Sequence, residues 1–143
     1  EKGKPLVGAI IKVFDDKNTL LGSFITNNKG KTAFRIPLNK YFFIEFSKTG
    51  YVSKIIQVNT NMPPEKKLAF IFPFEISIFK EVNGLDASML KNPIAKVVYN
   101  IIEQQFDYDY NFTNRINHEL KTLYEEYEKL KAQEAKSDTL NNK

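Results

Sequence analysis

Apolar and polar residues alternate along the first half of the chain, in short runs separated by turn-forming residues. The clearest run spans residues 41–48, where Phe42, Ile44 and Phe46 point one way and the residues between them point the other. Turns interrupt such runs at intervals of about ten residues, which is the spacing of an all-β sandwich. The pattern therefore predicts antiparallel strands at residues 6–14, 20–26, 32–38, 41–48, 52–58 and 68–78.

Turn-forming residues support the ends of these strands. Gly30 closes the sequence Asn-Asn-Lys-Gly, and a glycine there can adopt the positive φ that a tight hairpin needs. Pro73 interrupts the last run, so we expect a bulge, an edge position or two shorter strands there. Asn83 and Gly84 then end the predicted sandwich, which gives a β domain over residues 1–82.

The residues after 82 follow a different pattern. Residues 94–99 are expected to add a strand, and apolar residues then recur at spacings of four and three, as on one face of a helix. We expect Thr113 to cap the start of this helix and the polar residues from about 132 to fray. Residues 83–143 thus form an extended arm followed by an amphipathic helix, with a stripe of Ile116, Leu120, Leu123, Tyr127 and Leu130.

Composition predicts a folded chain with an uneven charge. Of the 143 residues, 42% are hydrophobic and 13% aromatic, which is too much for a disordered chain. Residues 1–80 carry thirteen Lys or Arg against six acids, whereas residues 81–143 carry eight against eleven. The two halves could attract each other, the basic half could meet an anionic membrane surface or partner, or the lysines could serve only solubility. Nucleic acid is not an expected partner, because the basic residues are scattered and include only two arginines.

The absence of cysteine from the sequence excludes disulfides and thiolate metal sites. No apolar run approaches the roughly 20 residues that cross a bilayer, so no transmembrane segment is expected. The chain begins at Glu1 without a preceding Met, which indicates either that a signal peptide was removed or that the sequence starts at an internal boundary; of the two we favour export.

The residues that could carry chemistry do not complete a site. Residues 107–111 have the alternating oxygen spacing that opens a calcium loop, but Phe112 and His118 stand where such a loop needs Gly and Glu. His118 is the only histidine, and no Gly-x-Ser-x-Gly motif supplies a nucleophile. We therefore expect no catalytic residue, no metal and no cofactor, and a protein that is not an enzyme.

Three motifs resemble a known family when they are taken in order. They are GKPLVGA at residues 3–9, TNNKG at residues 26–30 and YFFIEFSKTGY at residues 41–51. Together they are similar to the carboxypeptidase regulatory-like family of Bacteroidota envelope proteins, also described as transthyretin-like or prealbumin-like. The resemblance covers about residues 3–60. It implies a Greek-key sandwich of about seven strands that serves as an accessory, binding or spacer module without zinc or catalytic residues.

The function expected from these features is that of a periplasmic or outer-membrane-associated accessory subunit, with the sandwich as scaffold. Its partners would be other envelope proteins, in an outer-membrane complex. The stripe could instead dock on the sandwich of the same chain, and two and a half heptads are too few to indicate a coiled coil. The expected contact residues are Phe106, Tyr108, Tyr110, Phe112, Ile116, Leu120, Leu123 and Tyr127.

Carbohydrate binding is the main alternative function. Aromatic side chains on a β-sandwich can stack on sugar rings, although the chain contains no Trp. The residues that could form such a platform are Tyr41, Phe43, Tyr108 and Tyr110.

Overall fold

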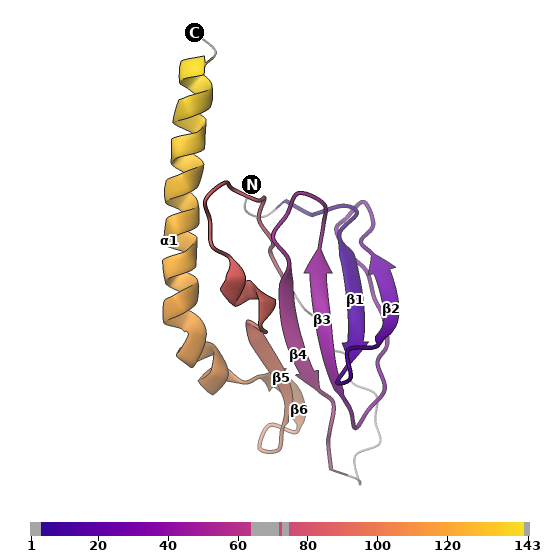
Figure 1. Ribbon diagram of the computed structural model, residues 1–143. Coiled ribbons are helices and arrows are strands. Elements are labelled where there is room, and N and C mark those ends of the chain that lie inside the picture. Colours follow the sequence, from indigo (N-terminus) through magenta and orange to yellow (C-terminus); the bar gives the residue numbers. More distant parts are fainter. Residues whose placement is uncertain (1–3, 64–71, 73–74, 142–143) are drawn as a thin grey trace.

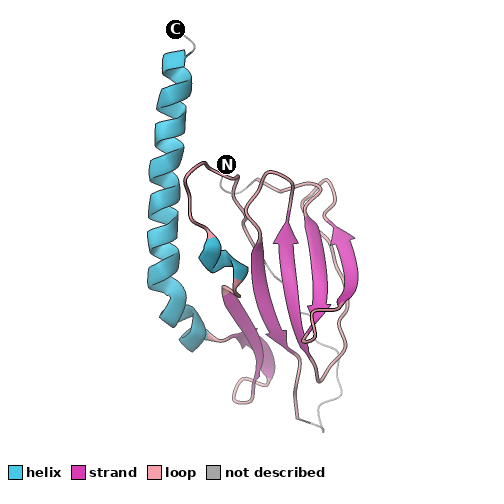
Figure 2. Ribbon diagram, viewed as in Figure 1, coloured by secondary structure: helices cyan, strands magenta, loops and turns pink. Residues whose placement is uncertain are grey.

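The computed structural model describes residues 4–63, 72 and 75–141. Within these residues the chain forms one six-stranded sheet, a short 3₁₀ helix and a long C-terminal helix beside the sheet (Figure 1, Figure 2). The protein is therefore mainly β with a C-terminal helix, as the sequence predicts. The elements are β1 (Ile10–Asp15), β2 (Leu20–Ile25), β3 (Tyr41–Ser47), β4 (Lys54–Asn59), η1 (Ser88–Lys91), β5 (Ala95–Asn100), β6 (Gln105–Tyr108) and α1 (Tyr110–Asn141).

The sheet is mixed rather than wholly antiparallel. Its strand order is β2-β1-β3-β4-β5-β6, and every neighbouring pair is antiparallel except β4 and β5. The parallel pair aligns Ile56 with Ala95 and Val58 with Val97. Parallel neighbours need a long crossover connection, and residues 60–94 provide it.

The core lies on one face of this sheet and confirms the alternation of residues 41–48. Phe42 and Ile44 are fully buried, and the register places them beside Val58 and Ile56 of β4. Burial of each of these side chains removes apolar surface from water and stabilises the fold by about 25 cal/mol for each Å² buried. The buried cluster consists of Ile11, Val13, Phe42, Ile44, Ile56, Val58 and Val97.

Side chains from outside the strands cover this core. Phe34 stacks on Phe24 of β2 with 4.8 Å between the ring centroids, and Ile36 packs against the same cluster. Residues 32–38, which the sequence predicts as a strand, form none. Side-chain packing and a hydrogen bond from the Thr60 hydroxyl to the carbonyl oxygen of Pro37, at 2.8 Å, hold this segment in place of a backbone ladder.

The last strand predicted for the sandwich, at residues 68–78, lies mostly outside the described residues. Phe72 and Ile76 pack against the core, and residues 75–79 form no strand. Lys80 then makes a single antiparallel bridge with Tyr51. The described residues therefore give six strands, where the sequence predicts about seven.

The sheet runs across the expected boundary at residue 82. β5 and β6 both follow that boundary in sequence, yet β5 pairs directly with β4 in the middle of the fold. β5 also contributes Val97 to the buried core. The first part of the arm therefore belongs to the sheet, and α1 follows directly after β6, the edge strand on that side.

Helix α1 begins three residues before the predicted cap at Thr113. Asp109 is the capping residue, because its carboxylate Oδ1 accepts the backbone N–H of Phe112 at 3.1 Å. The backbone N–H of Thr113 already bonds the carbonyl oxygen of Asp109, so Thr113 lies inside the first turn. Its hydroxyl donates to the same carbonyl at 3.2 Å.

The far end of α1 continues to Asn141, beyond the point near residue 132 where fraying is expected. Residues 131–139 are exposed on every side, and this part of the helix extends past the sheet (Figure 1). Ala, Gln, Glu and Lys, which fill much of this stretch, are strong helix formers, and Glu134 Oε1 also accepts the backbone N–H of Asn83 at 3.3 Å.

We predict that Gly30→Ala lowers the free energy of unfolding more than Gly50→Ala does. Both glycines have positive φ, 70° and 82°, so either alanine costs about 1–2 kcal/mol in backbone strain. A Cβ on Gly30 would also lie 2.8 Å from Cβ of Pro5 and 2.9 Å from the backbone nitrogen of Leu6, whereas a Cβ on Gly50 meets nothing within 4 Å. Urea unfolding measures the difference. Equal losses in the two variants would contradict the close approach at Gly30.

Candidate interaction surface on the C-terminal arm

The structure places the eight predicted contact residues on β6 and α1, where most of them face inward. Phe106 and Tyr108 belong to β6 and pack against the core. The ring of Tyr108 meets Phe72 edge-on with 5.3 Å between centroids, and Phe106 meets Tyr99 in the same way at 5.5 Å. These two side chains therefore contribute to the packing of the sheet.

The stripe on α1 also faces the rest of the chain at its centre. Leu123 is buried, and the ring of Tyr127 lies 4.4 Å from that of Phe79 between centroids. Ile116 and Leu120 are half-buried. These contacts match the alternative in which the stripe docks within the chain, and contact of the stripe with a partner stays a prediction.

A buried lysine joins α1 to the sheet. Lys54 is the first residue of β4, and only 5% of its surface is exposed. Its Nζ donates to the hydroxyl oxygen of Tyr124 at 2.6 Å and lies 5.5 Å from the ring centroid of Phe79. A buried ammonium needs a hydrogen-bond acceptor, and aromatic faces attract it electrostatically. Helix α1 thus supplies the partner of a charge that the sheet buries.

Lys54 was not predicted as a contact residue, although the sequence carries a signal for it. Lys54 precedes Ile56 and Val58 at the two-residue spacing of a strand, so it shares their inward face. A charge on an inward face indicates a buried partner. The partner itself could not be read from the sequence, because Tyr124 lies 70 residues further on.

A second cationic contact holds the first turn of α1 against β5. Nζ of Lys96 lies 4.5 Å from the ring centroid of Phe112, and Cζ of Arg115 lies 5.8 Å from the same centroid. Phe112 is half-buried in this position. The ring of Phe112 therefore contacts Lys96 of β5, and its contact with a partner stays a prediction.

Tyr110 is the exposed member of the predicted set. Its hydroxyl donates to Asp107 Oδ1 at 3.3 Å, and the negative charge of Asp107 raises the pKa of the Tyr110 phenol above its ordinary value of 10.0. Burial raises the pKa of the Tyr108 phenol, with smaller contributions from Tyr110 and Asp107. Both phenols therefore stay protonated at neutral pH and act as hydrogen-bonding, amphipathic contact groups.

The turn between β5 and β6 exposes two adjacent isoleucines. Ile101 is 75% exposed and Ile102 is 90% exposed. The side-chain oxygen of Asn100 accepts the backbone N–H groups of Ile102 and Glu103, both at 3.0 Å, and Gln104 has a φ of 54°. The tip is therefore a constrained turn that presents apolar side chains to solvent. Neither isoleucine was predicted as a contact residue. Both follow the predicted strand at residues 94–99 directly, and two isoleucines in that place look like a continuation of the buried strand.

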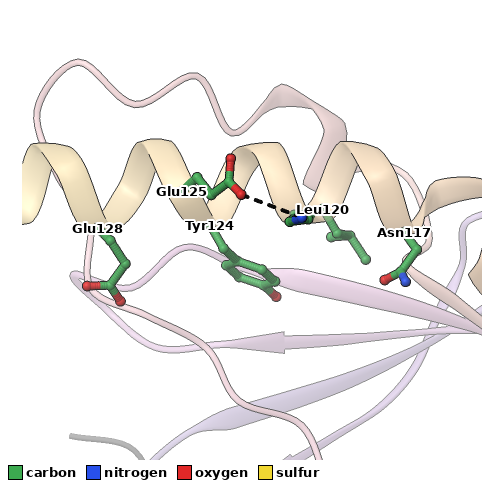
Figure 3. Close-up of a pocket in the computed structure, with 6 residues that line it drawn as sticks. Asn117, Leu120, Tyr124, Glu125 and Glu128 are labelled. Atoms are coloured by element: carbon green, nitrogen blue, oxygen red, sulfur yellow. Dashed lines mark ion pairs between the residues drawn. The ribbon is translucent and has the colours of Figure 1, made fainter.

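A shallow groove of about 610 Å³ runs along one side of α1 (Figure 3). Leu120 and Tyr124 supply apolar surface, and Lys121 pairs with Glu125 at 4.0 Å on the exposed side. Asn117 and Glu128 complete the lining. The groove offers an apolar strip with charged borders, which suits an amphipathic segment of another chain.

The four aromatic residues of the carbohydrate alternative do not form one platform. Tyr41 and Phe43 lie on β3, while Tyr108 lies on β6 and Tyr110 begins α1. β4 and β5 separate the two groups, which places β3 and β6 about 14 Å apart at the usual strand spacing. The inward packing of Tyr108 also differs from the exposed position of Tyr41.

Comparison with known proteins gave no match to a family model, a curated protein or a solved structure. Within the described residues, no group of three or more His, Asp or Glu side chains could hold a metal ion. Asp109, from the calcium-like stretch, is instead engaged in capping α1. In the same part of the chain, no helix is long and apolar enough to cross a bilayer.

We predict that Tyr124→Phe destabilises the fold by about 1–3 kcal/mol, because it leaves the buried ammonium of Lys54 without its acceptor. Lys54→Met combined with Tyr124→Phe should recover most of this loss, since neither polar partner is then left alone. Chemical unfolding of wild type, the two single variants and the double variant gives the coupling free energy. Additive losses would show that the contact does not hold α1 to the sheet.

We predict that Asp107→Asn lowers the pKa of Tyr110 towards 10.0, because it removes the negative charge beside the phenol. A spectrophotometric titration of tyrosinate, with Tyr110→Phe to identify the signal, measures the shift. Glu103→Gln on the neighbouring turn is the control for a general change in charge. An unchanged Tyr110 pKa in Asp107→Asn would contradict the contact.

Proposed function

We propose that this chain is a non-catalytic accessory or scaffold subunit of a cell-envelope assembly at the outer membrane, and that it binds its partners through the C-terminal arm and α1. The observation that carries the proposal is the exposed pair Ile101 and Ile102 on the constrained β5–β6 turn. Two adjacent branched side chains at the end of a hairpin suit insertion into an apolar pocket of another protein.

The rest of the arm supports this role. Tyr110 exposes an amphipathic ring where α1 begins, and the groove beside Leu120 and Tyr124 lies further along the same helix. At 1.5 Å per residue, the 32 residues of α1 extend for about 48 Å. The helix therefore extends from the edge of the sheet to a point well beyond it (Figure 1), and its contact groups lie in its first two thirds.

The proposal includes the finer fold. The motifs at residues 3–9, 26–30 and 41–51 support a carboxypeptidase regulatory-like Greek-key sandwich of about seven strands. Phe34, Ile36, Phe72 and Ile76 cover the core face of the sheet, as a second layer of a sandwich does. A location in the periplasm or at the outer membrane rests on the same resemblance to Bacteroidota envelope proteins.

Co-purification of a tagged chain from the envelope fraction of its source bacterium tests the proposal. Wild type should emerge with outer-membrane proteins, and the double variant Ile101→Ser, Ile102→Ser should recover at least about tenfold less of them. Burial of one isoleucine side chain is worth about 1.5–3 kcal/mol, so loss of two anchors exceeds a factor of ten in affinity.

Val7→Ser is the matched control. Val7 is also an exposed aliphatic residue, at 48%, but it lies in the turn before β1 rather than on the arm. It should leave the co-purified proteins unchanged. The proposal fails if wild type emerges alone, or if the arm variant recovers as much partner as the Val7 variant.

A further inference from the structure

β2 forms a free edge of the sheet. It pairs with β1 on one side, and it is the terminal strand of the order β2-β1-β3-β4-β5-β6. Just beyond β2, Thr26 bonds inward, donating to the carbonyl of Ala9 and accepting from the N–H of Gly8. By the two-residue period of a strand, Ser23 and Ile25 therefore turn their N–H and C=O groups outward. Among the residues that the structure describes, none hydrogen-bonds to this outer edge.

The edge lacks most of the features that usually prevent pairing with another strand. Natural edge strands carry charges, proline or β-bulges, or are very short. β6, the opposite edge, has four residues and carries Asp107. β2 has six residues without charge or proline, and it exposes Leu20, Leu21 and Ile25 at 50%, 53% and 65%. The one such feature in β2 is a bulge at Leu21, between the pairs Val13–Gly22 and Phe14–Leu20, and residues 22–25 continue the regular ladder after it.

The charges at the two ends of β2 favour an antiparallel second copy. Before β2, Asp15 ends β1 and Asp16 follows it in the turn beside Lys17, and the turn after β2 carries Lys29 followed by Lys31. An antiparallel neighbour of the same sequence brings the acidic turn of each copy to the basic turn of the other. A parallel neighbour would bring like charges together at both ends of the strand. Residues 19–28, which lie between the two turns, carry no charge, so they add no repulsion between the two copies.

We propose that two copies of this chain pair through their β2 edges, antiparallel about a two-fold axis near Ser23. The pairing would make one continuous sheet, with main-chain hydrogen bonds from Ser23 and Ile25 and apolar contacts from Leu21 and Ile25. A two-fold interface must be self-complementary, and this edge satisfies that requirement in hydrogen bonds, apolar surface and terminal charge. The two arms then lie at opposite ends of the joined sheet, since β6 is the edge furthest from β2.

Sedimentation velocity of the full chain over a wide concentration series tests the pairing. Wild type should dimerise, and Ile25→Lys should raise the dimer dissociation constant at least about tenfold, because it replaces the apolar contact with Leu21 of the other copy by a charge on the paired edge. Val7→Lys, which adds the same charge at an exposed site outside β2, is the control and should still dimerise. Circular dichroism establishes that each variant is folded, and the outward N–H of Ser23 makes Ser23→Pro a second variant with the same expected loss.

A charge exchange tests the orientation and the identity of the second strand. Asp16→Lys alone and Lys31→Asp alone should each weaken the dimer several-fold, because the axis near Ser23 brings Lys31 of one copy beside Asp15 and Asp16 of the other, and the two changes together in one chain should restore it. Restoration requires that both turns belong to copies of this chain. A monomeric wild type, a dimer that persists in Ile25→Lys, or a double variant weaker than either single variant would each overturn the proposal. Pairing of β2 with a strand of another protein would appear as one of these outcomes, the monomeric wild type.

Discussion

The parallel pairing of β4 with β5 is the constraint on which the rest of the structure depends. Parallel neighbours cannot be joined by a tight turn, so a long crossover connection must return the chain from the end of β4 to the start of β5. On the way, that connection places Phe72 and Ile76 over the core. The pairing also makes β6 the outer strand and sets the point where α1 leaves the sheet. The arm is thus held by backbone hydrogen bonds at its origin rather than joined to the sheet by a flexible linker.

Lys54 connects this constraint to the position of the helix. β4 buries the ammonium, and the acceptor comes from Tyr124 on α1 with the ring of Phe79 from the crossover beside it. Three segments distant in sequence therefore satisfy one charge. The surface left for partners is the hairpin tip, Tyr110 and the open part of the groove beside the helix, where Leu120 and Tyr124 are only partly covered.

The sequence predicted the features that depend on neighbouring residues. Alternation identified β3 and its buried face, and Gly30 has the positive φ expected of its turn. Features set by distant contacts were not predictable in this way, among them the parallel pairing, the loss of the strand at residues 32–38 and the partner of Lys54. The cap was wrongly predicted at Thr113, because Asp109 is an equally suitable capping residue. Only the structure shows that the helix begins at Tyr110 and that the backbone N–H of Phe112 bonds the Asp109 side chain. The apolar pair at residues 101–102 has the composition of a strand, so the sequence did not show that the pair lies in an exposed hairpin turn.

Native-state hydrogen exchange tests the central claim, that the arm is an integral part of the sheet and presents a solvent-exposed tip. The account predicts that amides of β5 exchange as slowly as those of β4, through global unfolding, while residues 101–104 exchange rapidly. Exchange of β5 and β6 at the rates of an unfolded peptide, with β1 to β4 still protected, would contradict it.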